Sequence, residues 1–503
     1  MKFRYQTLKN AIVSSPEVRR SRNHPRLRTL DQDAPERHAS WLELFFDLVF
    51  VFAVSQVARI LAEHSDSAGF ARYVVLFVPI WYSWVGYTFY ADRFETDEAL
   101  YRALMFSGML AVIGFSLVLG NAFTIAGDPP FILCYILVRL VLVALYVRAA
   151  YYVPLARPYC YQFIIGLSIS AVILVASLEV APPYRYAVWA IAIMFEFAIP
   201  FINIKATRLI PVDRSHVPER FGLFTIIVLG EAVIATATGA GGVAWNSASV
   251  LMASAGFAMA ACIWWINFDF VEDNAITSPA LLPRFVFLYG HLFIVGSIVA
   301  IGVGVEHAII ESHEPHLHLP ALILTAGGIA VYMAAITIIR MVTGVCNRVF
   351  ERLVIVAVSL LAIYIGQFLP PIAVVFGLLA LMIGGIWIET RYGAEHEDAA
   401  EPPRLLPCEH VGEAVVHQPR SADGCEECRK NNYKWVHLRL CLSCGHVGCC
   451  DTSVNKHATK HYLKTGHPII ASIEPGENWA WCYVDERFVP APRVEKVPEP
   501  VVT

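Results

Sequence analysis

The sequence predicts an all-α polytopic membrane protein of about 12 transmembrane helices, arranged as two parallel six-helix repeats and followed by a small α/β domain. The 503-residue chain is 57% hydrophobic and only 16% charged, which is too apolar for a soluble protein of this size. Apolar segments of about 20 residues, the length that crosses a hydrocarbon core, recur along most of the chain. The second domain is indicated by cysteine, because eight of the 12 cysteines lie between Cys408 and Cys482.

The predicted spans follow one another between residues 37 and 390, which we assign to the membrane domain. They lie near 41–62, 70–91, 100–122, 130–152, 160–180, 184–204, 219–239, 245–268, 285–305, 319–340, 350–369 and 371–389. The last two spans are separated only by Pro370 and Pro371, so both eleven and twelve spans are compatible with the pattern.

The distribution of basic residues predicts the orientation. Residues 1–36 form a basic arm whose first 28 residues carry eight lysines and arginines against the single acid Glu17. No apolar segment follows at signal-peptide distance, so we expect a retained cytoplasmic arm. With twelve spans, the arm-side connections hold most arginines, and the opposite side holds only Arg59, Arg72 and Arg185. The positive-inside rule then predicts a multi-pass protein of the cell (inner or plasma) membrane with both termini in the cytosol.

Two motifs recur about 180 residues apart and indicate the duplication. The pattern Arg-x5-Gly-x5-Gly occurs in the third and ninth spans, and an aromatic run ending in Asp closes the second and eighth. Their defining residues are Arg102, Trp84 and Asp92 in repeat one (about 37–205) and Arg284, Trp265 and Asp273 in repeat two (about 215–390). Six spans per copy return the chain to the same side, so the repeats would be parallel. Glycines and interfacial arginines are also frequent in membrane helices generally.

Ionisable residues at membrane depth are costly and mark candidate ion or solute sites. Glu43 and Asp47 share one face of the first span, and Glu231 lies near the middle of the seventh. Glu196 and Arg139 lie inside the sixth and fourth spans; an internal arginine–carboxylate pair is the alternative for such residues. We predict that Glu43, Asp47 and Glu231 converge from the two repeats on a polar cavity that faces the cytosol.

The run Trp41-Leu-Glu43-Leu-Phe45-Phe46-Asp47, together with Glu219-Arg220-Phe221-Gly222, resembles the signature of the bacterial low temperature requirement protein A family. The resemblance covers roughly residues 35–390 and implies a multi-span membrane fold rather than a particular substrate. A weaker likeness links Phe45-Phe46-Asp47 to potassium channels built from two six-helix repeats with an F-S-D first helix. Here Phe46 replaces the serine, so the likeness implies shared architecture without potassium selectivity.

The cysteine-rich tail predicts a zinc domain, because paired C-x-x-C motifs present two thiolates to one tetrahedral ion. The segment 408–486 resembles the ubiquitin-specific-protease-type (UBP) zinc finger through its C-x-x-C-G-H motif at 441–446 and Trp481-Cys482-Tyr483. Helical spacing alone would give His457 and His461 to one ion. The resemblance instead implies three interleaved sets: Cys425, Cys428, Cys449, His457; Cys441, Cys444, His461, His467; and Cys408, His410, Cys482, Asp485. Asp485 stands where the family usually has cysteine, and Cys450 is an alternative to Cys449.

The UBP resemblance also implies a peptide pocket at Trp481 and Tyr483, which would stack on an extended protein C-terminus. In the family an arginine near this pocket binds the terminal carboxylate, whereas this chain has Cys450-Asp451-Thr452 there. A zinc-stabilised docking or regulatory domain without peptide capture is the alternative.

These features predict an integral membrane channel or transporter for an ion or small solute, regulated by a cytosolic finger that binds two or three zinc ions. The alternative is a membrane-anchored adaptor whose finger binds a protein partner. No enzyme motif stands out, so we expect no enzyme. The expected partners are the lipid bilayer, an ion or small solute and a cytosolic protein, with possible homo-oligomers and no nucleic acid. Residues 391–407 would form a linker, and 487–503 a disordered Pro-rich tail.

Overall fold

The computed structural model describes residues 24–27, 39–95, 98–210, 212–213, 216–270, 281–343, 349–397, 408–412, 418–421, 424–431, 433–451, 453, 455–474, 479–485 and 487–489. Within these residues the chain forms two compact units, Met1–Thr390 and Arg391–Thr503, which are described separately. Asp273, most of the predicted basic arm and the predicted tail from residue 490 lie outside the described residues.

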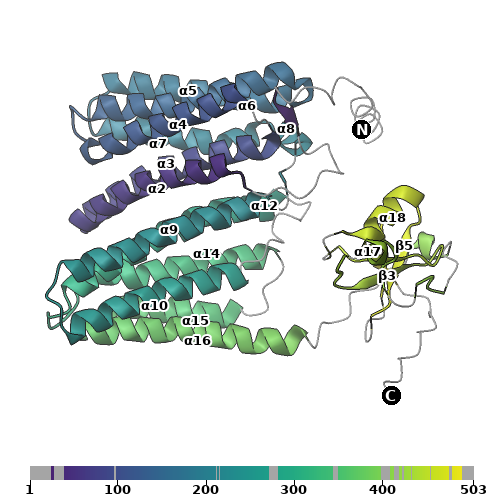
Figure 1. The fold of residues 1–503 in the computed structure, drawn as a ribbon. Helices are drawn as coiled ribbons and strands as arrows, with labels where there is room; N and C mark the ends of the chain where they lie inside the picture. The colour runs from purple at the N-terminus through teal and green to yellow at the C-terminus, as the bar shows by residue number, and fades with distance from the viewer. Residues whose placement is uncertain are drawn as a thin grey trace. The chain divides into compact units, whose positions relative to one another are not determined.

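Among the described residues, twelve helices are long and apolar enough to cross a membrane (Figure 1). The first half contains six of them: α2 (Trp41–Glu63), α3 (Ser67–Arg93), α4 (Ala99–Val118), α5 (Asp128–Tyr152), α6 (Arg157–Ala176) and α7 (Tyr184–Ile202). A short helix, α8 (Ile204–Leu209), follows. The second half contains α9 (His216–Gly241), α10 (Ser247–Phe270), α12 (Leu281–Ile310), α13 with α14 (Leu319–Leu322, Gly328–Thr343), α15 (Val349–Ile365) and α16 (Pro371–Glu397). The predicted fold class, a polytopic helical membrane protein, is confirmed.

Local sequence explains where several helices begin and end. Ser40 caps α2, because its hydroxyl accepts from the Glu43 amide at 3.3 Å while the Glu43 carboxylate accepts from the Ser40 amide at 2.7 Å. Pro370 cannot continue a helix, so a short 3-10 turn closes α15 and Pro371 opens α16 as a separate span. The twelve-span alternative therefore describes the structure. The last helix continues to Glu397, into the predicted linker.

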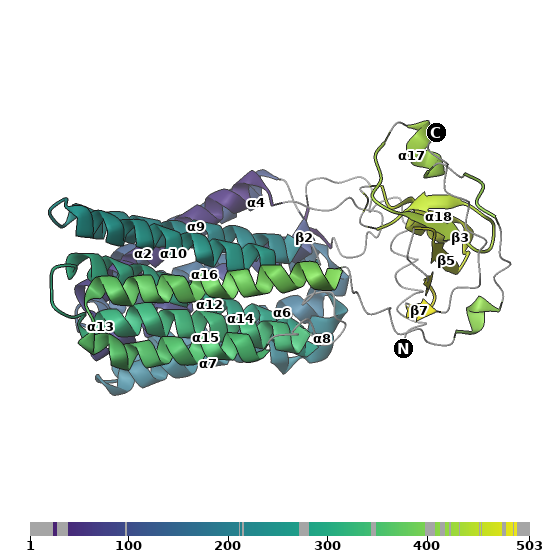
Figure 2. The ribbon, with the colours of Figure 1, turned by 90° about the horizontal axis from the view of Figure 1, so that it is seen from below.

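Within each half the first helix packs against the second and the third, and the third packs against the fourth. The halves meet through α2 and α3 on one side and α9 and α12 on the other (Figures 1 and 2). The side chains used to predict the repeats lie in different surroundings: Trp84 is buried, whereas Trp265 is 44% exposed. Arg102 is exposed and Arg284 is half-buried. The duplication therefore remains a prediction.

The carboxy-terminal unit contains a five-stranded antiparallel sheet in the order β4-β3-β5-β6-β7. Its strands and helices are α17 (Glu426–Lys430), β3 (Leu438–Cys441), β4 (Val447–Cys449), α18 (His457–Thr465), β5 (Ile469–Ser472), β6 (Ala480–Cys482) and β7 (Arg487–Val489). A small apolar core includes Leu440, Val447 and Ile469. Residues 487–489 pair with β6, which differs from the predicted disordered tail, because Val489 adds to this core.

Candidate functional sites

The first site is a buried cluster of charges between the two halves of the membrane domain. Arg220, in the first turns of α9, places Nη1 3.2 Å from Glu43 Oε1 and Nη2 2.5 Å from Asp47 Oδ1, both on α2. The indole of Trp84 donates to the same Asp47 oxygen at 2.7 Å. All four side chains are almost fully buried. Glu43 and Asp47 are therefore sealed by an arginine rather than open to an aqueous cavity.

His216 extends this cluster by one turn. Its Nε2 lies 3.3 Å from Glu43 Oε1, and its Nδ1 lies 3.2 Å from Asp92 Oδ1 at the end of α3. Neither His216 nor Arg220 is among the predicted site residues. Arg220 lies in the Glu219–Gly222 run that carries the family resemblance, and this was the available signal.

Glu231 lies elsewhere on α9. It is 11 residues beyond Arg220, which corresponds to about 16 Å of helix. Its Oε2 accepts a hydrogen bond of 2.5 Å from the Ser55 hydroxyl of α2. The convergence of Glu43, Asp47 and Glu231 on one cavity was therefore predicted wrongly. The spacing of residues along helices could not show that Arg220 occupies the space between the two carboxylates.

Glu196 and Arg139 form a second buried pair, inside the first half. Arg139 Nη2 lies 2.6 Å from Glu196 Oε2, which also accepts from the Tyr135 hydroxyl at 2.8 Å, and Ser170 donates to Oε1 at 2.7 Å. The guanidinium lies over the rings of Tyr82 and Tyr135, and its Nε and Nη1 have no hydrogen-bond partner among the described residues. This is the internal arginine–carboxylate pair that the sequence left open as an alternative.

A cleft of about 100 Å³ lies between the two halves. Its walls come from α3, α5, α6 and α7 of the first half and from the first turns of α9 and α12 of the second. Arg93, Arg139 and Arg284 line it, and most of the other lining side chains are aromatic or aliphatic. Glu43, Asp47 and Glu231 do not line it.

The halves are in contact at the opposite end of the same helices. Near the beginning of α3, the Tyr73 hydroxyl donates to the Gly296 carbonyl of α12 at 2.6 Å. Near the end of α12, His307 Nε2 lies 3.1 Å from the Ala62 carbonyl of α2. The cleft therefore lies at one end of the interface between the halves, beside the contacts of His216 and Arg220, and a second set of contacts lies at the other end.

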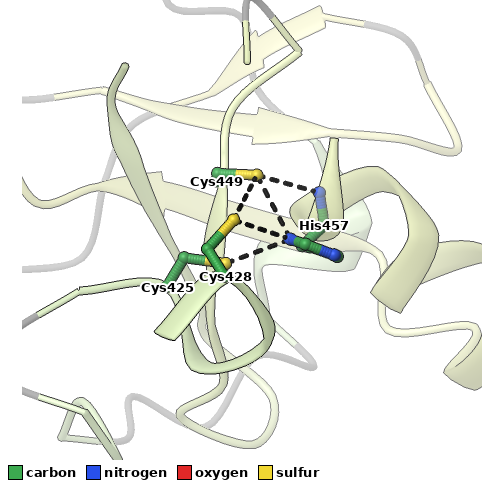
Figure 3. A group of neighbouring side chains, drawn as sticks. All are labelled: Cys425, Cys428, Cys449 and His457. Atoms are coloured by element: carbon green, nitrogen blue, oxygen red, sulfur yellow. Dashed lines mark hydrogen bonds between the residues drawn. The ribbon is translucent and has the colours of Figure 1, made fainter. Parts of the chain in front are cut away.

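The carboxy-terminal unit contains three groups of four potential metal ligands, and in each group the ligand atoms lie within 4.8 Å of one another. Figure 3 shows the first, in which Cys425, Cys428 and Cys449 face the ring of His457. The three sulfurs lie 3.2, 3.2 and 3.4 Å from His457 Nδ1, and Cys428 and Cys449 are 3.8 Å apart. Two sulfurs on a tetrahedral zinc ion, with bonds of about 2.3 Å, would be separated by about 3.8 Å. The residues therefore fit zinc.

The second group joins Cys441 and Cys444 to His461 and His467. Cys444 Sγ lies 3.2 Å from His461 Nε2, and Cys441 Sγ lies 3.5 Å from His467 Nδ1. His457 and His461 lie about one turn apart on α18 yet belong to different groups. The ring of His457 lies near the cysteines of α17 and β4, whereas that of His461 lies near the turn after β3. The structure thus brings together the interleaved sets that the resemblance implied, rather than the set that helical spacing alone gives.

The third group contains Cys408, His410, Cys482 and Asp485. His410 Nδ1 lies 3.5 Å from Cys408 Sγ, 3.7 Å from Cys482 Sγ and 3.5 Å from Asp485 Oδ2. The same Asp485 oxygen is 3.0 Å from Arg487 Nη2, so its charge is shared. Cys450, the alternative ligand, instead points toward the Ser453 hydroxyl at 3.4 Å.

The predicted peptide-pocket residues have separate partners. The Tyr483 ring stacks on Tyr462 with 4.5 Å between centroids, and its hydroxyl lies 2.9 Å from the Thr459 hydroxyl. The Trp481 ring packs edge-on against Phe488. Thr459 also donates to Asp451 at 2.6 Å, which places a carboxylate beside Tyr483. Asp451 is unfavourable for a ligand carboxylate there.

Comparisons with known proteins match both units. The model of the zinc finger in ubiquitin hydrolases and other proteins matches residues 425–493. "Uncharacterized protein RA0937" of Rhizobium meliloti (strain 1021) is 26% identical over 307 residues, which cover 56% of this chain and 72% of that protein. The NAD-dependent deacetylase sir2A of Dictyostelium discoideum is 35% identical over 79 residues, 16% of this chain and 14% of that protein.

The solution NMR structure of protein RPA1320 from Rhodopseudomonas palustris is 47% identical, with a TM-score of 0.17. The match covers 19% of this chain and 99% of that one. The model of the bacterial low temperature requirement A protein matches residues 38–386, well over half of the chain. Together with the twelve apolar helices, this match assigns the chain to the bacterial low temperature requirement A protein family.

Proposed function

We propose that the membrane domain moves a small solute across the bilayer by alternating access between its two halves. The observation that carries this proposal is a cleft between the halves at one end of their interface, whereas Tyr73 and His307 join the halves at the opposite end. Binding sites of secondary transporters lie between structural halves, and rocking of one half against the other exposes the site to alternate sides. On the predicted orientation, this cleft lies toward the cytosol.

The carboxylates of the first and seventh spans have no direct role in the proposed cleft, because they do not line it. Glu43 and Asp47 contact Arg220 across the interface, so these charges join the halves beside the cleft. The adjacent residues Val217 and Phe221 line the cleft itself. Movement of the halves would therefore alter the surroundings of both the ion pairs and the cleft.

We further propose that the finger regulates the membrane domain from the cytosol and binds three zinc ions, one in each group of ligands. Each of the three groups supports one ion, because in each group the four ligand atoms lie within 4.8 Å of one another. The thiolates would supply all of the negative charge at the first two ions, and the third group would combine two thiolates with an imidazole and a carboxylate.

Flux into proteoliposomes, measured with a panel of organic anions, cations, neutral solutes and protons, tests the transport proposal. We expect at least one solute to enter faster than into protein-free liposomes. Leu288→Trp should abolish that flux by filling the cleft, because Leu288 lines it. Leu110→Trp, at a side chain that is 69% exposed, serves as the matched control and should transport normally. The absence of flux for the whole panel, or normal flux in Leu288→Trp, would overturn the proposal.

A membrane-anchored adaptor is the second candidate, favoured by the sealing of Glu43 and Asp47 by Arg220. Such pairs are also expected where charges only hold helices together. The adaptor would move no solute, and its activity would require the finger. Removal of residues 391–503 distinguishes the candidates: a transporter should retain flux with altered regulation.

A further inference from the structure

We propose that the cleft binds a small organic anion that joins one anionic group to an apolar body, with Arg93 as its principal contact. The inference rests on the proposed function, because it names the class of solute that the cleft would accept. It concerns binding, however, and binding can be measured without flux.

Arg93 is a buried cation without a carboxylate partner among the described residues. Its side chain is 5% exposed and donates from Nε to the Ile210 carbonyl and from Nη1 to the Phe89 carbonyl, each at 3.2 Å. The neighbouring Asp92 carboxylate is engaged by His216 instead. The guanidinium also lies over the rings of Phe89 and Tyr159, 5.0 and 4.9 Å from their centroids. Neutral carbonyls and rings compensate a buried charge only in part, and an anion in the cleft would offset it further.

Arg139 adds a second guanidinium to the same wall. One of its nitrogens is paired with Glu196, but Nε and Nη1 have no hydrogen-bond partner in the described part of the chain. Gly86 also lines the cleft, and a Cβ atom at Gly86 would lie 3.9 Å from Nη1. Arg284 lines the cleft as a third arginine, and the described lining residues include no aspartate or glutamate. Glu196 balances the charge of Arg139, so the excess positive charge that an anion would meet comes from Arg93.

The rest of the lining suits an apolar body. Rings from both halves contribute to it, among them Phe89, Tyr159, Phe163, Phe221 and Tyr289. The volume of about 100 Å³ is somewhat smaller than the ~150 Å³ apolar cavity that accepts benzene. The cleft is partly open, so it need not enclose the whole ligand, and a single ring or a short chain that carries one carboxylate matches the polarity of its lining. An anionic lipid headgroup shares the charge, and the experiment separates the two.

The test is calorimetric titration of the full-length protein, in detergent without added lipid, with 3-phenylpropionate, its neutral amide and acetate. We expect saturable binding of 3-phenylpropionate and affinities at least about tenfold lower for the other two, because each lacks either the charge or the body. Arg93→Gln should weaken 3-phenylpropionate binding about tenfold or more, and Arg93→Lys should retain most of it. Arg59→Gln, at an arginine that is 66% exposed and outside the cleft, is the control.

Equal affinity for the carboxylate and the amide overturns the inference, and this comparison needs only the unaltered protein. Repeating the titration in phosphatidylcholine and phosphatidylglycerol nanodiscs tests whether a lipid headgroup occupies the cleft. If 3-phenylpropionate binds in phosphatidylcholine but is displaced competitively in phosphatidylglycerol, the occupant is a lipid headgroup, and the small-molecule inference is overturned. Binding without flux would refute the proposed transport alone. Flux of another solute without anion binding would refute this inference alone.

Discussion

At the scale of single residues, Arg220 has the most consequential surroundings in the membrane domain. One guanidinium contacts two carboxylates from another helix, and all three groups are inaccessible to solvent. Removing one partner of a buried ion pair leaves an uncompensated charge, which typically costs about 3–5 kcal/mol. The stability of the contact between the two halves should therefore depend strongly on Arg220.

Arg220→Gln should lower the free energy of unfolding by about 3–5 kcal/mol, because Glu43 and Asp47 would lose their cation. Unfolding of the purified protein in detergent by denaturant measures the change. Arg59→Gln, which removes an exposed pair with Glu63, should change stability by less than about 1 kcal/mol. Adding Asp47→Asn to Arg220→Gln should restore part of the loss, because contacting residues are not additive. Additive losses would show that the pair is not energetically coupled.

Asp485 decides the number of zinc ions. It is the only oxygen ligand in the three groups of described residues, and Arg487 competes for its charge. Asp485→Ala should reduce the zinc content from three ions per chain to two, as counted by native mass spectrometry. Cys450→Ser should leave three, because Cys450 belongs to none of the groups. Three ions in Asp485→Ala would remove Asp485 from the ligands.

At the scale of elements, the finger should depend on pH through its thiols. Burial raises the pKa of Cys425 to about 12 and that of Cys441 to about 11 in the metal-free chain. These thiols are therefore protonated at neutral pH, and zinc must displace their protons to bind. Zinc affinity should consequently fall as the pH falls, because protons compete for the same sulfurs. A colorimetric chelator, added between pH 8 and 5, should remove zinc faster at the acid end.

Loss of zinc should also unfold α18, because His457 and His461 hold this helix against α17 and the strands. Hydrogen exchange of residues 457–465 should accelerate when zinc is removed, while the spans of the membrane domain keep their protection. Unchanged exchange after complete removal would show that the small apolar core suffices.

The close approach of α9 and α12 depends on small residues. A Cβ atom at Gly302 would lie 2.8 Å from the Ala232 Cα, a backbone atom that cannot move alone. Gly302→Ala should therefore destabilise the membrane domain by about 1–3 kcal/mol. The same substitution at Gly377, which has open space around it, should be neutral or stabilising by up to about 1 kcal/mol. A loss of stability in Gly302→Ala without a loss in Gly377→Ala, measured by thermal unfolding, identifies packing as the cause.

At the scale of the whole molecule, the sequence predicted what depends on composition and local spacing. Span length and hydropathy locate the twelve helices, and cysteine and histidine density locates the finger. The partner of Asp47 could not be predicted, because Arg220 is 173 residues away and meets it only through the packing of α9 on α2. The cleft could not be predicted for the same reason, because its walls come from segments of both halves. β7 was missed because three residues carry too little pattern.

The proposed movement makes a final prediction at the end of the interface opposite the cleft. His307 Nε2 contacts the Ala62 carbonyl there, so the halves must separate at these positions when the site opens to the other side. Cysteines at Ala62 and His307, joined by a short bis-methanethiosulfonate, should therefore reduce flux to the level of protein-free liposomes, and a reductant should restore it. Each single-cysteine variant, treated with the same reagent, controls for reaction at the native cysteines. Titration of the cross-linked protein with 3-phenylpropionate should still show binding, because the cleft lies at the end of the interface opposite the cross-link. Full flux after complete cross-linking would mean that the halves do not part here, and the alternating movement would have to be abandoned.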